Sequence, residues 1–260
     1  MFEIEGQMNT AICYAKVVEQ DAIEQIKRMC DYEFTKDSKI RIMPDVHAGK
    51  GCTIGTTMTV HDKVVPNIVG VDIGCGMYTV NLGNIDILCF LYGKYLEDYL
   101  YDVEICQDFA RRNRETIADI LLQRTGLQGS DGFHTVHNYI DTKEMILRKG
   151  AIAAHEGERV LIPINMRDGS VLAVGKGNPE WNYSAPHGAG RLMSRRLAKE
   201  QLNMDDYREM MKGIYTTSVC METLDEAPMA YKSLDDIIDV IQETVDVIGV
   251  MKPIYNFKAN

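Results

Sequence analysis

Residues 67–77 read Asn67-Ile68-Val69-Gly70-Val71-Asp72-Ile73-Gly74-Cys75-Gly76-Met77, an apolar run that leads into a glycine-rich turn. The close spacing of the branched apolar residues, and the glycines that end the run, predict a short buried strand. The turn carries one carboxylate, Asp72, and one thiol, Cys75. This pair suits a borderline-soft divalent cation such as manganese or zinc. The simpler alternative is a turn aspartate beside a buried cysteine, and the stretch taken alone favours it.

The composition predicts one intracellular domain. A chain of 260 residues with 45% hydrophobic residues is long enough to bury a full core. Its seven cysteines are widely spaced without a Cys-x-x-Cys pair, which favours a reducing cytoplasm over a disulfide framework. The first residues lack the features of a signal peptide, and no apolar stretch reaches membrane-spanning length. We therefore expect a soluble cytoplasmic protein without a membrane partner.

The charge distribution restricts how this protein would bind nucleic acid. Its formal net charge of -10 argues against a general coating protein, because phosphate binding depends on clustered Lys and Arg. Positive charge is nevertheless concentrated at residues 111–114, at 148–149 and between 191 and 199. Such clusters are able to form a local RNA-binding groove on an acidic protein.

The patterns of apolar residues predict an α+β fold of mixed sheets around a central cleft, with helices outside. Helical spacing predicts helices within residues 15–32, 86–121, 192–202 and 234–248. Strands are predicted over residues 41–47, 53–60, 63–71, 78–82, 160–166, 170–174 and 251–257. The sequence Asp168-Gly169 favours a tight turn between the strands on either side of it.

Three segments carry polar side chains of the types used in active sites. Asp45, His47 and Lys50 lie on a glycine-bearing loop that is either a solvated surface loop or part of a site. His134 and His137 would point to opposite faces of a strand, whereas a helix or bend would let both bind one metal.

The third segment is the glycine-rich stretch before the helix predicted at residues 192–202. There, His187-Gly188-Ala189-Gly190-Arg191 would place His187 at the mouth of an anion site formed by the helix start. The remaining histidine-bearing turn, around His155, is predicted to be exposed.

The chain resembles the RtcB family of RNA-splicing ligases. The matching strings, which run in family order, are Met43-Pro44-Asp45-Val46-His47 with Gly49-Lys50-Gly51, Val71-Asp72-Ile73-Gly74-Cys75-Gly76-Met77, His137-Asn138-Tyr139, Arg148-Lys149-Gly150-Ala151, Gly175-Lys176-Gly177-Asn178-Pro179, residues 187–195, and Asp225-Glu226-Ala227-Pro228 through Tyr231-Lys232. The resemblance implies GTP- and manganese-dependent joining of RNA ends that carry a 2′,3′-cyclic phosphate or 3′-phosphate to a 5′-hydroxyl. His187 would attack GTP and carry GMP, which then passes to the RNA 3′-phosphate and is displaced by the 5′-hydroxyl.

The resemblance also implies roles for individual residues. Asp72, Cys75 and His137 would bind Mn²⁺, of which the family holds two ions. The residues that would hold GTP or GMP are His137, Asn138, Pro163, Ile164, Asn165, Met166, Ser170, His187, Gly188, Ala189, Gly190, Tyr231 and Lys258. Of these, Tyr231 is suited to packing on guanine and Lys258 to its carbonyl. Our candidates for RNA or phosphate contacts are Asp45, His47, Lys50, Arg148, Lys176 and Arg191. An archease-like activator is a further implied partner.

The chain departs from the family pattern in one block. Members normally carry a Gly-Gly-Asn-His string and a His-Ser-Gly-Ser-Arg string, each with a metal-ligand histidine, but no histidine lies between Cys75 and His134 here. We place the junction of this internal shortening near residues 87–91 within a single domain. His134 is the candidate substitute for one lost ligand. The segment 163–166 also lacks the small Gly-Ser of many members.

Three hypotheses therefore stand at the level of sequence. The first is an active RNA ligase, for tRNA halves or broken RNA. The second is a catalytically impaired relative that binds RNA or a nucleotide without a complete metal site. The third is a metal-dependent phosphoesterase that uses Asp72, Cys75 and the loop with Asp45 and His47.

Overall fold

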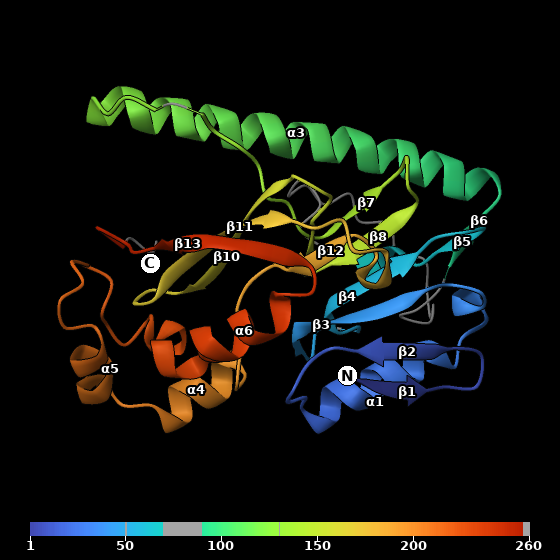
Figure 1. Cartoon of the computed structure of the whole chain (residues 1–260), viewed down its shortest axis with the longest axis horizontal. Helices are drawn as coiled ribbons and strands as arrows, with labels where there is room; N and C mark the ends of the chain where they lie inside the picture. The colour runs from blue at the N-terminus through green and yellow to red at the C-terminus, as the bar shows by residue number, and fades with distance from the viewer. Residues whose placement is uncertain (50, 70–89, 130, 257–260) are drawn as a thin grey trace.

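The structure is a computed structural model that describes residues 1–49, 51–69, 90–129 and 131–256, and every structural statement below concerns these residues (Figure 1). Two β-sheets and their helices build the body of the molecule, and one long helix lies along the edge shown at the top of Figure 1. This arrangement confirms the predicted α+β class.

The larger sheet has six strands in the order β1-β2-β3-β4-β8-β7. Their bounds are β1 Phe2–Glu5, β2 Thr10–Cys13, β3 Ile40–His47, β4 Ile54–Thr59, β7 Tyr139–Asp141 and β8 Ile146–Lys149. Only the β2–β3 pair is parallel, and α1 (Gln20–Cys30) forms the crossover between them. Helix α1 buries Ala22, Ile26 and Met29, which share one helical face, in the core of this sheet.

The smaller sheet is the antiparallel set β10 (Arg159–Asn165), β11 (Gly169–Gly175) and β13 (Val245–Met251). Helix α6 (Leu234–Ile241) packs Ile237 and Ile241 against it. A two-stranded ribbon of β9 (Ala151–Ala153) and β12 (Ser184–Pro186) follows directly from β8. This ribbon joins the two sheets, because β9 lies against β4 and the ribbon residues Ile152 and Ala185 share a core with β10 and β11.

The remaining elements lie outside the two sheets. Helix α3 (Lys94–Thr125) has 32 residues, of which only Leu96 and Val103 are buried. The other elements are β5 (Lys63–Val64), β6 (Leu91–Tyr92), α2 (Pro66–Val69), α4 (Arg195–Gln201), α5 (Met204–Met210), and the 3-10 turns η1 (Glu33–Thr35), η2 (Pro179–Trp181), η3 (Leu224–Glu226) and η4 (Pro228–Ala230).

The strand predicted over residues 63–71 and the helix predicted over residues 86–121 differ from the observed elements. The strand predicted over 63–71 is wrong for its described part, since only β5 is extended there and α2 begins at Pro66, a residue favoured at the first helical position. The rest of this prediction, with the strand predicted over 78–82, lies outside the described residues. The helix predicted from residue 86 begins at Lys94, after Gly93 with its positive φ of 56°.

The C-terminal prediction places a helix where the structure has a strand. Helix α6 ends at Ile241, and Val245–Met251 forms β13 instead of the last turns of that helix. The valines and isoleucine of this segment suit a strand, and β13 pairs along β11. The last strand is predicted over residues 251–257, whereas the structure has it at Val245–Met251.

The predicted turn at Asp168-Gly169 is confirmed, because β10 and β11 pair as a hairpin there. Gly169 has φ of 85°, and a Cβ at this position would lie 2.0 Å from the carbonyl oxygen of Met251. We expect Gly169→Ala to lower the free energy of unfolding by about 1–3 kcal/mol, the usual cost of strained backbone. Thermal unfolding measures this effect.

The matched control is Gly249→Ala on the neighbouring strand β13. A Cβ there meets nothing within 4 Å, so this substitution should leave the midpoint of unfolding nearly unchanged. Equal midpoints for the two variants would contradict the close approach of Met251 to the turn.

Candidate functional site

A cleft of about 1130 Å³ lies between the smaller sheet, the segment after β12 and residues 133–137, which precede β7. Its lining includes most of the residues that the resemblance connects with GMP, namely His137, Pro163, Ile164, Asn165, Met166, Ser170, His187, Gly188, Ala189, Gly190 and Tyr231. Among the RNA or phosphate candidates, His47 and Arg191 line it as well. Segments that are far apart in the sequence thus meet around one cavity.

His187 lines this cleft and is paired with Asp45, which lies buried beneath the lining. Nδ1 of His187 lies 2.7 Å from Oδ2 of Asp45. Asp45 is completely buried, and within the described part of the chain its Oδ1 has no hydrogen-bond partner. A carboxylate accepts, so Nδ1 of His187 carries the proton and the lone pair of the neutral ring is on Nε2.

The surroundings of His187 raise its pKa. Burial opposes the charged imidazolium, but the charge of Asp45, the hydrogen bond to it and a backbone hydrogen bond with Gly150 outweigh burial. His187 is therefore held in place by a carboxylate rather than by solvent. In this respect it resembles a histidine oriented for catalysis more than a core histidine.

Two further imidazoles flank His187. The rings of His137 and His187 have centroids 4.8 Å apart. Nδ1 of His47 lies 2.9 Å from the carbonyl oxygen of Asp45, which only accepts, so Nδ1 donates and Nε2 has the lone pair of the neutral ring. Burial lowers the pKa of His47 and favours that neutral form.

Glycines allow the chain to pass close to the Asp45–His187 pair. Gly190 has φ of 74°, and a Cβ there would lie 2.4 Å from the carbonyl oxygen of Asp45. Gly150 has φ of 59°, and its Cβ would lie 3.3 Å from Cε1 of His187. Asn138 does not line the cleft; its Oδ1 accepts a 2.7 Å hydrogen bond from the backbone N–H of Gly150.

The buried ammonium group of Lys232 lies next to the backbone of β3 on either side of Asp45. Lys232 is 9% exposed, and its Nζ donates to the carbonyl oxygens of Pro44 at 2.8 Å and Val46 at 3.3 Å. These two residues flank Asp45 in β3. Burial lowers the pKa of Lys232, and the charge of Asp45 acts in the opposite direction. Lys232 thus places a positive charge beside a carboxylate that is fully removed from water.

A charged network closes one side of the cleft around Tyr231. The Tyr231 hydroxyl lies 2.5 Å from Oε2 of Glu226, and the guanidinium of Arg191 lies over the tyrosine ring at 4.8 Å. Arg191 also donates to the carbonyl oxygen of Asp225 at 2.7 Å. Arg195 from the start of α4 pairs with the side chain of Asp225 at 2.7 Å. Because Arg191 also pairs with Glu226 at 3.3 Å, both arginines at the cleft are bound by carboxylates.

Two of the predicted phosphate contacts lie elsewhere. Arg148 is completely buried, with Nε donating to Oγ of Ser184 at 2.8 Å, and this burial contradicts the prediction that it contacts RNA. Lys176 donates to the carbonyl oxygen of Gln242 at 2.6 Å and pairs with Asp246 at 3.0 Å, outside the cleft lining.

The predicted anion site at a helix start is wrong. Residues 187–190 precede α4 by several positions, because that helix begins at Arg195, capped by Ser194. Ala189 instead donates its N–H to the carbonyl oxygen of Pro163 at 3.1 Å. This contact holds the segment of His187 against β10.

The two other histidines noted in the sequence lie outside the cleft. Nε2 of His134 is 3.1 Å from Oε1 of Glu115 on α3, so His134 and His137 do face different sides. His155 is not an exposed turn residue: it is half-buried, 2.8 Å from Glu158 and 2.9 Å from Glu144.

The predicted metal ligands are only partly within the described residues. Asp72 and Cys75 lie outside them, as do Lys50 and Lys258. Within residues 1–49, 51–69, 90–129 and 131–256, no three His, Cys, Asp or Glu side chains form a group able to hold a metal ion. Of the three predicted metal ligands, the structure therefore describes His137 alone, and the described residues do not form a metal site by themselves.

Several residues of the site escaped sequence analysis. Glu226, Arg195 and residues 251–256 line the cleft, and Lys232 supports Asp45. Lys232 and Glu226 lie inside a family string, which was the available signal. Residues 251–256 reach the cleft only because β13 docks on β11.

No helix among the described residues has the length and apolar character needed to cross a membrane.

Comparisons with known proteins connect this geometry with one family. A family model described as tRNA-splicing ligase RtcB matches residues 25–86 and 81–259. RNA-splicing ligase RtcB1 of Escherichia coli is 32% identical over 188 residues, which cover 65% of this chain and 46% of the relative. The tRNA-splicing ligase RtcB of Thermococcus kodakarensis is 38% identical over 104 residues, 37% of this chain and 22% of the relative. The chain spans about half the length, or less, of the curated relatives it matches.

The burial of Asp45 and Lys232 predicts energetic coupling between them. Asp45→Asn or Lys232→Met leaves the other charge buried with less compensation, so each should lower the free energy of unfolding by about 3–5 kcal/mol. The double variant leaves neither charge. Its loss should be smaller than the sum of the two single losses by about 0.5–3 kcal/mol, measured by urea unfolding.

The control for this cycle is the exposed pair of Lys16 and Asp239, whose side chains lie 3.1 Å apart. Lys16→Met and Asp239→Asn should each change the free energy of unfolding by less than about 1 kcal/mol. The coupling energy between them should also stay below about 1 kcal/mol. Strict additivity of the Asp45 and Lys232 variants would contradict charge compensation at the site.

Proposed function

The chain belongs to the RtcB family, and we propose that it joins RNA ends bearing a 2′,3′-cyclic phosphate or 3′-phosphate to 5′-hydroxyl ends through a GMP–His187 intermediate. The observation that carries this proposal is His187 in the lining of the cleft, with its Nδ1 held by the buried Asp45, beside residues of the family strings at 43–47, 137–139 and 225–232. The printed names of the relatives, RNA-splicing and tRNA-splicing ligases, support the same reaction class.

The first step follows from the orientation of the imidazole. Asp45 holds the proton on Nδ1, so the lone pair of Nε2 attacks the α-phosphorus of GTP. A P–N bond forms, the bond to the bridging oxygen breaks and pyrophosphate leaves. A 2′,3′-cyclic end is first opened by water to the 3′-phosphate. An oxygen of this 3′-phosphate attacks the phosphorus of GMP, the P–N bond breaks and its electron pair returns to Nε2. Finally the 5′-hydroxyl attacks the phosphorus of the 3′-phosphate and loses its proton to solvent, GMP leaves, and the new phosphodiester forms.

The lining of the cleft supports a place for guanosine beside His187. Tyr231 presents a half-buried ring that already carries Arg191 over it, and we propose that guanine packs on this tyrosine. The loop of residues 163–166 and Ser170 border the same space. Lys258 is proposed for the guanine carbonyl by resemblance alone.

We propose Mn²⁺ as the metal, held by Asp72, Cys75 and His137. His137 lies against His187, which supports a metal near the reacting phosphate. The chain has no histidine between Cys75 and His134 and matches the family model in two pieces. Both facts support the internal shortening, and they favour a second candidate function: an RNA- or nucleotide-binding relative that lacks a complete metal site.

The biological setting is part of the proposal. Substrates of this chemistry are tRNA halves or broken RNA, an archease-like protein would act as activator, and the buried, unpaired cysteines Cys13, Cys30 and Cys52 support a reducing cytoplasm. Burial raises the pKa of Cys52 to about 11, so this thiol stays protonated and unreactive.

Labelled GTP tests the function directly. With GTP labelled in the α-phosphate and Mn²⁺, we expect an acid-labile adduct on the wild-type chain and none on His187→Ala. The control His155→Ala removes an imidazole outside the cleft and should keep the adduct. Saturable binding of RNA without an adduct would support the second candidate function, and phosphate release without joining would indicate a phosphoesterase.

Asp45→Asn tests the role assigned to the carboxylate. Without the charge that orients Nδ1–H, the rate of adduct formation should fall by at least about 100-fold while GTP binding changes little. Rapid-quench measurement of the adduct, with Asp239→Asn as the surface control, separates the two quantities. An unchanged rate would show that Asp45 does not orient the nucleophile.

A further inference from the structure

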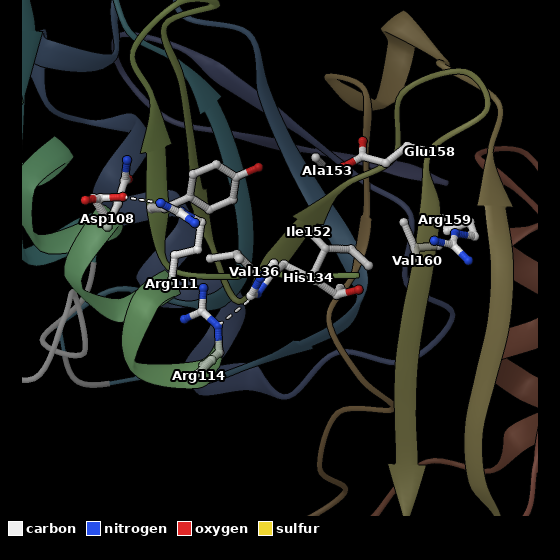
Figure 2. Close-up of a pocket in the computed structure, with 13 residues that line it drawn as sticks. Asp108, Arg111, Arg114, His134, Val136, Ile152, Ala153, Glu158, Arg159 and Val160 are labelled. Atoms are coloured by element: carbon white, nitrogen blue, oxygen red, sulfur yellow. Dashed lines mark hydrogen bonds and ion pairs between the residues drawn. The ribbon is translucent and has the colours of Figure 1, made fainter. Parts of the chain in front are cut away.

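A second cavity, of about 460 Å³, lies between α3, the segment 133–139 and strands β9 and β10. Figure 2 shows Arg111 and Arg114 reaching it from α3, with His134 and Val136 opposite them and Val160 on β10. Its inner wall is apolar, with Val136, Ile152 and Val160. Its rim carries three arginines, Arg111, Arg114 and Arg159, and two carboxylates, Asp108 and Glu158.

This cavity adjoins the cleft of His187 across a single segment of chain. Phe133, Thr135 and His137 line the cleft, whereas His134 and Val136 line the second cavity. Thr135 and Ile152 line both. The backbone N–H of Leu161 donates to Oγ1 of Thr135 at 3.2 Å, which fastens the dividing segment to β10.

The arginines at the rim differ in whether a carboxylate pairs with them. Arg111 lies 2.6 Å from Asp108 and 3.0 Å from Glu115, and Arg159 pairs with Asp131. Glu158, the other carboxylate of the lining, pairs with His155. Arg114 touches Nδ1 of His134 at 3.5 Å, and within the described residues no carboxylate pairs with it. Its guanidinium is therefore available for an anion.

We propose that the second cavity binds a nucleotide of the RNA strand whose end lies at His187, with a phosphate on Arg114 and a base against Val136. This inference rests on the proposed function, since it extends the path of the same substrate. Single-stranded RNA presents both chemistries at once, anionic phosphates and flat apolar bases, and proteins bind it with cationic grooves beside apolar or planar side chains. The volume is within the range of about 300–1,000 Å³ typical of ligand pockets.

An acidic peptide fits these observations less well. It would satisfy Arg114 but would leave the apolar wall without a partner, and nothing would connect it with the neighbouring cleft. The carboxylates Asp108 and Glu158 in the lining would repel it, as they would a phosphate, but RNA gains the contact of a base in compensation.

Binding of a fluorescently labelled single-stranded RNA of about 12 nucleotides with a 3′-phosphate tests the proposal by anisotropy. Arg114→Gln should weaken binding about fivefold and reduce the slope of log affinity against log salt by about 0.7, the loss of one phosphate contact. The matched control is Arg112→Gln, two positions away, which pairs with Asp108 and does not line the cavity. It should change affinity less than twofold.

Two further measurements make the outcome decisive. A nucleoside 3′-phosphate cannot occupy both cavities at once, so Arg114→Gln should weaken its binding at His187 less than it weakens binding of the 12-nucleotide RNA. Equal losses for the Arg114 and Arg112 variants, equal losses for the RNA and the nucleoside 3′-phosphate, or equal competition by polyglutamate would overturn the proposal. GMP adduct formation needs no RNA and should be unchanged in Arg114→Gln; its absence from the wild-type chain would count against ligation and leave the RNA comparison intact.

Discussion

The hydrogen bond between Nδ1 of His187 and Oδ2 of Asp45 is the contact on which the site depends. It joins residues that are 142 positions apart, one at the end of β3 in the larger sheet and one just after β12. Burying a carboxylate completely costs several kcal/mol unless opposite charge and hydrogen bonds offset it. Lys232 and His187 supply that compensation, so a carboxylate that is costly to bury is also the group that orients the imidazole.

The rest of the fold can be understood as the support that this contact needs. Arg148, buried in β8, donates to Ser184 and thereby fixes the ribbon that delivers His187. Pro44 lies in the stretch of β3 where the register with β4 shifts, and there the carbonyl groups on either side of Asp45 are free to accept from Lys232. Gly190 lets the two segments approach to a distance that a side chain would prevent.

The sequence was most informative where local rules decide the structure. The turn at Asp168-Gly169 and helix α1 follow from residue type and spacing. The family strings at 43–47, 137–139, 187–195 and 225–232 belong to segments that meet around the cleft only in three dimensions. It failed where tertiary contacts choose between alternatives: Val245–Met251 has apolar residues compatible with either helix or strand, and pairing with β11 decides. Arg148 and Lys232 look like surface cations in sequence, because nothing local shows that carbonyl and hydroxyl acceptors will surround them in the core.

The charges that line the cleft limit how the triphosphate of the proposed substrate GTP could be neutralised. A triphosphate brings several negative charges to His187, yet Arg191 and Arg195 already pair with Asp225 and Glu226 at this wall. The carboxylates fix these arginines and at the same time reduce the field that GTP would experience. Neutralising the nucleotide therefore requires that it displace these pairs, or that charge come from Lys252 at the cleft or from the segments with Asp72, Cys75 and Lys258. In the proposed mechanism, the fold orients the imidazole of His187 through Asp45 without those segments. The proposed reaction with GTP would depend on them as well, because they carry the proposed metal ligands Asp72 and Cys75.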